Sequence, residues 1–303
     1  MTKNNIHCWQ WNELNVSWKV EGYNPRSSVV TVLIHGFGAS KEHWRKNQIF
    51  LGNITPSYSL DLIGFGDSSQ PIAILPGEKS FTKGFLYNFD NWGLQVSEFC
   101  RLVIKKPVIF IGNSIGGVVA LRAARSLQGS CKGVILINCA QRTMDDKRLS
   151  QQTKVVQLIR PFLKNIIRKK WLSKSLFQNA ANPNFIEKIL KQAYPSGQHL
   201  DKELINLIYS PTQREGAAEA FHGFVNIFND HLAPDLMKNL NVPVDLIWGD
   251  SDPWEALSEA RQWLASIKCI RSLEIIKGAG HCPHDEAPEK VNGFLGKIIQ
   301  QAT

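Results

Sequence analysis

One serine of the chain, Ser114, lies in a sequence context that would make its hydroxyl a nucleophile. It stands in Gly112-Asn113-Ser114-Ile115-Gly116, after a short apolar run and directly before a helical pattern. A glycine two residues away on each side leaves room for a tight strand-to-helix turn, which lifts the serine Oγ out of a sheet. A hydroxyl in this position attacks a carbonyl carbon once a base takes its proton. The pattern therefore predicts a serine enzyme.

The best candidate for that base is His281, in Gly280-His281-Cys282-Pro283. It follows the last apolar run of the chain on a glycine-rich loop, the placement expected of a histidine that must reach the nucleophile. His284, three residues later, is the alternative base. The two histidines could also suggest a metal pair, but no third ligand is in view, so we expect no metal site.

A carboxylate must hold the histidine in the correct tautomer. Asp250 and Asp252 both follow the apolar run from Val244 to Ile247, and both qualify by position. We favour Asp252, because it lies further into the loop and directly before Pro253. Asp145 is a third choice.

The oxyanion that forms during acyl transfer needs backbone N–H donors, each contributing about 10²–10³ in rate. One donor is expected from Ile115, the residue after the nucleophile. The other is expected from Phe37 in His35-Gly36-Phe37-Gly38, where Gly36 and Gly38 allow the backbone to turn toward the site.

Elements of two kinds alternate along most of the chain. Short apolar, β-branched runs predict strands at 29–34, 58–62, 108–111, 134–137, 244–247 and 272–276, and an antiparallel pair is predicted at 8–10 and 17–20. Longer periodic segments predict helices at 92–103, 115–127, 256–267 and 288–300. Strands that alternate with helices indicate an α/β fold, with a mostly parallel central sheet flanked by helices.

The segment from residue 141 to residue 236 interrupts this alternation. It contains no convincing strand, and its periodic stretches predict helices at 154–172, 184–194, 201–209 and 214–228, with Pro161 breaking or kinking the first. We therefore predict a core domain formed by residues 1–140 and 237–303, with an all-helical cap, residues 141–236, inserted between two strands.

Five motifs in order resemble the α/β-hydrolase family over nearly the whole chain: His35-Gly-Phe-Gly38, Asp61-x-x-Gly-x-Gly-x-Ser68, Gly112-Asn-Ser-Ile-Gly-Gly117, Gly249-x-x-Asp-Pro253 and Gly280-His-x-Pro283. The order of nucleophile, acid and histidine is also that of the family. The resemblance implies an α/β-hydrolase fold. A serine nucleophile argues against the branches that use an aspartate, the haloalkane dehalogenases and epoxide hydrolases.

A narrower resemblance, to the pheophytinase-like branch of plants and cyanobacteria, rests on Phe37-Gly-Ala-Ser40 with His43-Trp-Arg45, and on Asp250-Ser-Asp-Pro-Trp254 with Gly280-His-Cys-Pro-His-Asp-Glu286. Members of this branch cleave the phytyl ester of chlorophyll pigments. The resemblance implies a small-molecule carboxylic ester substrate with a long apolar alcohol. No cofactor is needed.

The net charge of +9 is concentrated in the insert, where ten basic residues between Gln141 and Lys174 face only Asp145 and Asp146. The first predicted helix is amphipathic, which is typical of a lid with its apolar face over the pocket. The same charge would also suit peripheral contact with an anionic membrane. No nucleic-acid-binding motif accompanies this charge.

The sequence contains no signal peptide and no apolar run long enough to span a membrane, so we expect a cytoplasmic protein, or one at a membrane surface.

Two other functions use the same fold. A carbon–carbon lyase or hydrolase, such as the cyclohexadiene-carboxylate synthase of quinone biosynthesis, would need cationic side chains inside the pocket to hold an acidic substrate. A non-catalytic ligand receptor is the second alternative, and an intact set of Ser114, His281 and Asp252 counts against it.

Overall fold

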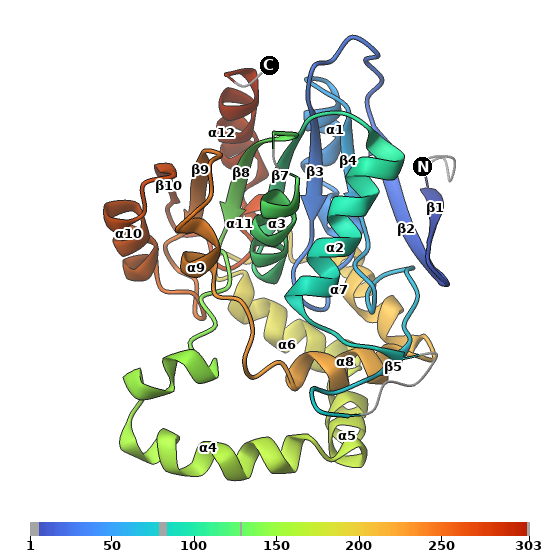
Figure 1. The fold of residues 1–303 in the computed structure, drawn as a ribbon, viewed down its shortest axis with the longest axis vertical. Coiled ribbons are helices and arrows are strands. Elements are labelled where there is room, and N and C mark those ends of the chain that lie inside the picture. Colours follow the sequence, from blue (N-terminus) through green and yellow to red (C-terminus); the bar gives the residue numbers. More distant parts are fainter. Residues whose placement is uncertain (1–5, 79–83, 128, 302–303) are drawn as a thin grey trace.

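A computed structural model describes residues 6–78, 84–127 and 129–301, and its centre is an eight-stranded sheet (Figure 1). The strand order is β1-β2-β4-β3-β7-β8-β9-β10. The first two pairings, β1 with β2 and β2 with β4, are antiparallel, and all the others are parallel. These strands are Ile6–Trp11, Leu14–Glu21, Val30–Ile34 (β3), Ser57–Leu60 (β4), Val108–Asn113 (β7), Cys131–Ile137 (β8), Val244–Gly249 (β9) and Ile270–Ile276 (β10). The predicted mostly parallel sheet is confirmed.

Helices cover both faces of the sheet, because the central strands are apolar on both sides. In β7, Val108 and Phe110 join the core beneath α2, α3, α9 and α10, whereas Ile109 and Ile111 join the core beneath α1 and α12. These helices are Gln48–Gly52 (α1), Phe89–Phe99 (α2), Ile115–Ser126 (α3), Ala233–Met237 (α9), Leu257–Ser266 (α10) and Pro288–Gln300 (α12). Shorter elements are β5 and β6 (Ile72–Ala73 and Gly84–Phe85), α11 (Pro283–Glu286), and the turns η2 (Lys41–Trp44) and η3 (Cys100–Ile104).

The chain between β8 and β9 forms helices and no strand over residues 138–243, all of which the structure describes. Besides α9, they are η4 (Asp146–Gln151), α4 (Lys154–Ile167), α5 (Lys170–Ala180), α6 (Pro183–Ala193), α7 (Lys202–Tyr209), η5 (Ser210–Gln213) and α8 (Ala217–Val225). Most of them lie together at one end of the sheet, and α4 runs along the outer edge of this group (Figure 1).

One local expectation for the insert is wrong, because the helix predicted at 154–172 is two helices that meet at residues 168–169. Pro161 lies inside α4 and does not end it. Proline has no N–H, so the carbonyl of Gln157, four residues earlier, lacks its helical donor. In the described part of the chain, no helix has the length and apolar character needed to cross a membrane.

Candidate active site

Ser114 occupies the turn between β7 and α3 with strained backbone angles, φ 55° and ψ −123°. A non-glycine residue is rarely found at positive φ, and such strain is concentrated at functional sites. A Cβ on Gly112 would lie 2.3 Å from the carbonyl oxygen of Gly116, and a Cβ on Gly116 would lie 2.3 Å from that of Ile34. The close approach of these backbones therefore explains both glycines of the predicted motif.

His281 and Asp252 form a hydrogen-bonded pair, with 2.8 Å between His281 Nδ1 and Asp252 Oδ2. Burial alone would raise the pKa of Asp252, but the hydrogen bond and the charge of His281, with a further bond from the Trp254 N–H, lower the pKa of this carboxyl. Asp252 is then ionised at neutral pH and only accepts, so Nδ1 of His281 donates. Nε2 of the neutral His281 ring therefore carries no proton and can accept one. Ser114 and His281 line the same cavity.

The structure separates the alternative residues from this pair. The exposed Asp250 accepts a hydrogen bond from the Gly278 N–H instead of facing His281. Asp145 is paired with Arg142. His284 is buried against His43 and Trp44, and neither of its ring nitrogens has a hydrogen-bond partner among the described residues.

Two asparagines that the sequence interpretation missed join the loops of the site. Asn138 donates to Asp252 Oδ2 over 2.7 Å and accepts from the Gly249 N–H over 2.9 Å. Asn113 donates to the carbonyl oxygens of Ile137 and His281, at 3.1 Å each. Asn113 ends β7 and Asn138 directly follows β8. A polar residue at the carboxyl end of a parallel strand was the signal that could have revealed both.

Phe37 and Ile115 lie beside Ser114 in the cavity wall. Across the described residues, neither backbone N–H donates to a protein acceptor, so both are free for a ligand. Gly36 brings its loop to the nucleophile, since a Cβ there would lie 3.2 Å from Ser114 Cβ, and Gly38 has a φ of 72°. The loop predicted to supply an oxyanion donor therefore reaches Ser114.

The cavity has a volume of about 590 Å³ and a largely apolar wall. Helices α5, α6 and α8, with Ala181 directly after α5, contribute ten apolar residues to this wall: Phe177, Ala180, Ala181, Phe185, Ile186, Ile189, Leu190, Ala193, Phe221 and Phe224. Among the described lining residues, Arg142 is the only lysine or arginine, and buried Asp145 neutralises it. The cavity therefore favours an apolar ligand.

A buried polar network fastens the helical insert to the core next to this cavity. His43 Nε2 lies 2.8 Å from the hydroxyl of Tyr194, which donates to Asp285 over 3.1 Å. Arg45 binds Asp285 through two nitrogens, at 2.9 and 3.0 Å, and also binds Asp201. Burial lowers the pKa of His43 to about 4, so this ring is neutral. Several residues that carried the narrower resemblance thus meet in one anchoring network.

Glu255 is a second carboxyl in the cavity wall, and the sequence interpretation missed it. It follows Asp252 by three residues and accepts a hydrogen bond from the Gln141 N–H over 2.8 Å. Burial, assisted by the charges of Asp252 and Glu259, raises the pKa of Glu255 to about 8. This side chain is therefore mostly protonated at pH 7.

Replacing Glu255 with glutamine is expected to remove a pH-dependent loss of stability. Because the folded pKa exceeds the usual value of about 4.3, ionisation favours the unfolded chain. The protonated carboxyl of Glu255 stabilises the folded chain fully below about pH 4.3. This contribution to stability falls as the pH rises and is lost above about pH 8. Glu255→Gln should therefore match the wild type at pH 5 and melt at least about 2 °C higher at pH 9. Thermal melts between pH 5 and pH 9 measure the melting temperature of each variant.

Glu215→Gln, at an exposed carboxyl, is the control. Identical pH profiles for both variants would contradict the raised pKa of Glu255.

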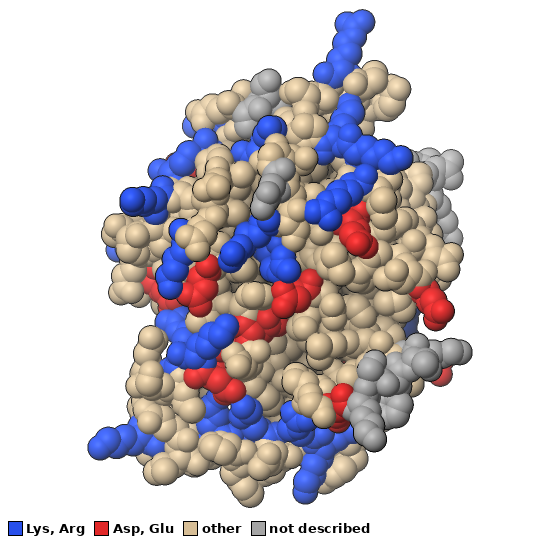
Figure 2. Space-filling model, viewed as in Figure 1, with Lys and Arg blue, Asp and Glu red and all other residues tan. Residues whose placement is uncertain are grey.

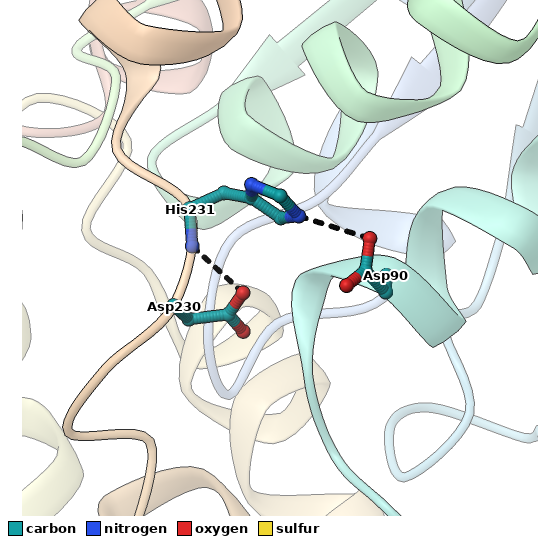
Figure 3. A group of neighbouring side chains, drawn as sticks. All are labelled: Asp90, Asp230 and His231. Carbon is teal, nitrogen blue, oxygen red and sulfur yellow. Dashed lines mark hydrogen bonds and ion pairs between the residues drawn. The ribbon is translucent and has the colours of Figure 1, made fainter.

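Asp90, Asp230 and His231 form a separate cluster away from the cavity (Figure 3). His231 Nε2 lies 2.9 Å from Asp90 Oδ1, which also accepts from Arg122 over 2.6 Å. Asp230 accepts from the N–H of Phe89 at the start of α2. These contacts join α2 to the segment between α8 and α9. The Arg122 guanidinium already pairs with Asp90, so these contacts are explained as a structural connection rather than as a metal site.

Comparison with known proteins places this site in a family. Residues 31–294 match the model of the alpha/beta hydrolase family. The chain is 27% identical to the chloroplastic pheophytinase of Arabidopsis thaliana over 95% of its own length, and it spans 65% of that protein. It is 26% identical to the uncharacterized hydrolase YugF of Bacillus subtilis, with 92% of this chain and 93% of YugF covered.

Solved structures agree on the fold. A thermophilic esterase from Thermogutta terrifontis superposes with a TM-score of 0.69 at 20% identity, covering 100% of this chain and 99% of the esterase. The family match includes the nucleophile turn, the acid loop and the histidine loop. The chain belongs to the alpha/beta hydrolase family.

Proposed function

We propose that this hydrolase cleaves a carboxylic ester through Ser114, His281 and Asp252. The observation that carries the proposal is the strained Ser114 turn, which shares a cavity with His281, whose ring is hydrogen-bonded to Asp252. Ser114 Oγ attacks the ester carbonyl while His281 Nε2 takes its proton, and the oxyanion binds to the N–H groups of Phe37 and Ile115. His281 then gives the proton to the leaving alcohol. Water attacks the acyl-enzyme by the same route, which releases the acid and regenerates Ser114.

We propose further that the alcohol is large and apolar. The apolar wall of the cavity and the likeness to a pheophytinase support this substrate class. A second cavity, of about 470 Å³, lies between α4 and α8 and shares Arg142 and Phe224 with the first. One side of α4 lines it with Ile159, Leu163 and Ile167. Such a substrate dissolves in lipid, so we place the enzyme in the cytoplasm at a membrane surface. Residues 141–236 act in this proposal as the cap over the site.

The substrate class is tested by esters of one acid with alcohols that run from ethanol to phytol. We expect kcat/KM to rise by up to about fourfold for each added methylene until the cavity is full, because a buried methylene contributes about 0.8 kcal/mol. Ala180→Trp, which fills the cavity, should remove this rise and leave hydrolysis of the ethyl ester unchanged. Gln178→Trp, on the exposed side of α5, is the matched control. A preference for short alcohols in the wild type would contradict the proposal.

Arg142 in the cavity wall is the one feature that favours carbon–carbon cleavage of an acidic substrate. Its pairing with buried Asp145 leaves little free charge to bind a carboxylate, so we rank this activity second. A receptor that does no chemistry would leave Ser114 unreactive. Rapid labelling of Ser114 by a fluorophosphonate, with loss of all ester hydrolysis at the same rate, would favour the enzyme.

A further inference from the structure

Helix α4 leaves large apolar side chains in solvent. Leu158 is 81% exposed, Phe162 is 66% exposed and Val155 is 63% exposed. These three positions lie three and four residues apart, so they share one side of the helix. Trp171, in the first turn of α5, is 68% exposed. Single exposed apolar residues are ordinary, but a concentration of them on adjoining helices indicates an interaction surface. We call these four side chains the docking face.

The segment that carries the docking face is strongly basic. Residues 147–186 contain no aspartate or glutamate and nine lysines and arginines. Lys154, the first residue of α4, and Lys169, two residues after its end, make no ion pair within the described residues. Lys170 and Lys174 share one carboxylate, that of Glu219. Figure 2 shows Lys and Arg side chains gathered between uncharged residues along the edge of the molecule where α4 and α5 lie. The surface therefore combines apolar and cationic groups.

We propose that α4 and the start of α5 dock on an anionic lipid surface. Apolar side chains above a basic segment are typical of helices that lie in the membrane interface. The 14 residues of α4 are too few to cross a bilayer. A second copy of the chain would bring like charges together in a symmetric pair, and a nucleic acid would leave the aliphatic side chains uncovered. An anionic lipid surface satisfies both the charges and the apolar groups.

Docking also explains how a lipid-dissolved substrate reaches Ser114, and this step rests on the proposed function. The neighbouring side of α4, which begins at Val155, lines the second cavity, and this cavity shares Arg142 and Phe224 with the cavity at Ser114. With the docking face in the interface, an ester would pass from the lipid beneath α4 toward the nucleophile. Vesicle binding itself requires no hydrolysis.

Sedimentation of the full chain with phosphatidylcholine vesicles that contain or lack phosphatidylglycerol tests the docking. We expect binding only with phosphatidylglycerol, weakening as salt rises. The double variant Leu158→Asp and Phe162→Asp should lower the partition coefficient at least about tenfold, and so should Lys154→Glu with Lys169→Glu. Ile49→Asp, at a residue of α1 that is 65% exposed, is the matched control and should bind like the wild type. Hydrolysis of a short, water-soluble ester by each variant verifies folding.

The outcomes separate docking from catalysis. If the wild-type chain hydrolyses the short ester but does not bind anionic vesicles, the docking proposal is wrong and the proposed function is unaffected. A chain that binds vesicles through the docking face but hydrolyses no ester retains the docking and loses the function. Unchanged binding by the Leu158→Asp and Phe162→Asp variant also overturns the proposal. The same holds for a wild-type dimer that this variant converts to a monomer, because the face would then be a subunit interface.

Discussion

Replacing Ser114 with alanine is expected to lower kcat by about 10⁶. In the proposed mechanism Ser114 Oγ forms the acyl-enzyme, and alanine has no atom that can replace it. His281→Ala should cost a similar factor, because the two side chains act as one unit and their effects do not add. Steady-state hydrolysis of a p-nitrophenyl ester measures both, with single-turnover release of p-nitrophenol as the test for acylation.

The matched control is Ser251→Ala, at an exposed serine on the acid loop whose hydroxyl contacts only Asp250 in the described structure. This variant should keep wild-type kcat and should still lose activity to a fluorophosphonate. Circular dichroism and thermal melts would show whether Ser114→Ala folds. Near-full turnover by a folded Ser114→Ala protein would refute the nucleophile assignment.

The parts of the fold that the sequence predicted correctly are those dictated by local pattern. The strands of the parallel sheet are buried on both faces, so they read as continuous apolar runs such as Val108 to Ile111. The nucleophile turn was predictable for a different reason. Only glycine fits where the backbones of Gly116 and Ile34 meet, and this constraint is written in the sequence.

Other features depend on tertiary contacts that a local pattern does not contain. Pattern alone assigned the apolar side of α4 to the pocket, yet Leu158 and Phe162 face solvent and Arg160 is buried. Arg160 is drawn inward by Asp146 and by the ring of Phe228, which come from outside α4. No α4 residue is among the described residues that line the cavity at Ser114, so the lid interpretation of α4 is wrong for this cavity, to which α5, α6 and α8 contribute instead.

The choice between the two carboxylates of the acid loop shows the same limit. Asp250 and Asp252 are equivalent by position after β9, and sequence position gave only a preference for Asp252. The direction of each side chain depends on its partners. Gly278 engages Asp250, whereas Asn138, Trp254 and His281 all donate to Asp252. Trp254 belongs to the same loop, but Asn138, Gly278 and His281 come from two other places in the chain, which a local pattern does not include.

Exchanging Asp252 for asparagine is expected to lower kcat by about 10⁴. Asp252 Oδ2 accepts from both Asn138 and His281, and Oδ1 accepts from the Trp254 N–H, so the NH2 group of an asparagine must face donors in either orientation. An N–H aimed at His281 Nδ1 selects the tautomer that carries its proton on Nε2. That imidazole can no longer take the proton of Ser114.

Asp250→Asn is the control for this exchange, because asparagine still accepts from the Gly278 N–H, and it should retain wild-type kcat. The loss at Asp252 should appear in the acylation rate, with thermal stability that stays close to the wild type. Comparable kcat values for the two variants would mean that the hydrogen bond between Asp252 and His281 is structural. A large loss at Asp252 alone would assign the carboxylate to the mechanism, since the two exchanges make the same chemical change within three residues of the same loop.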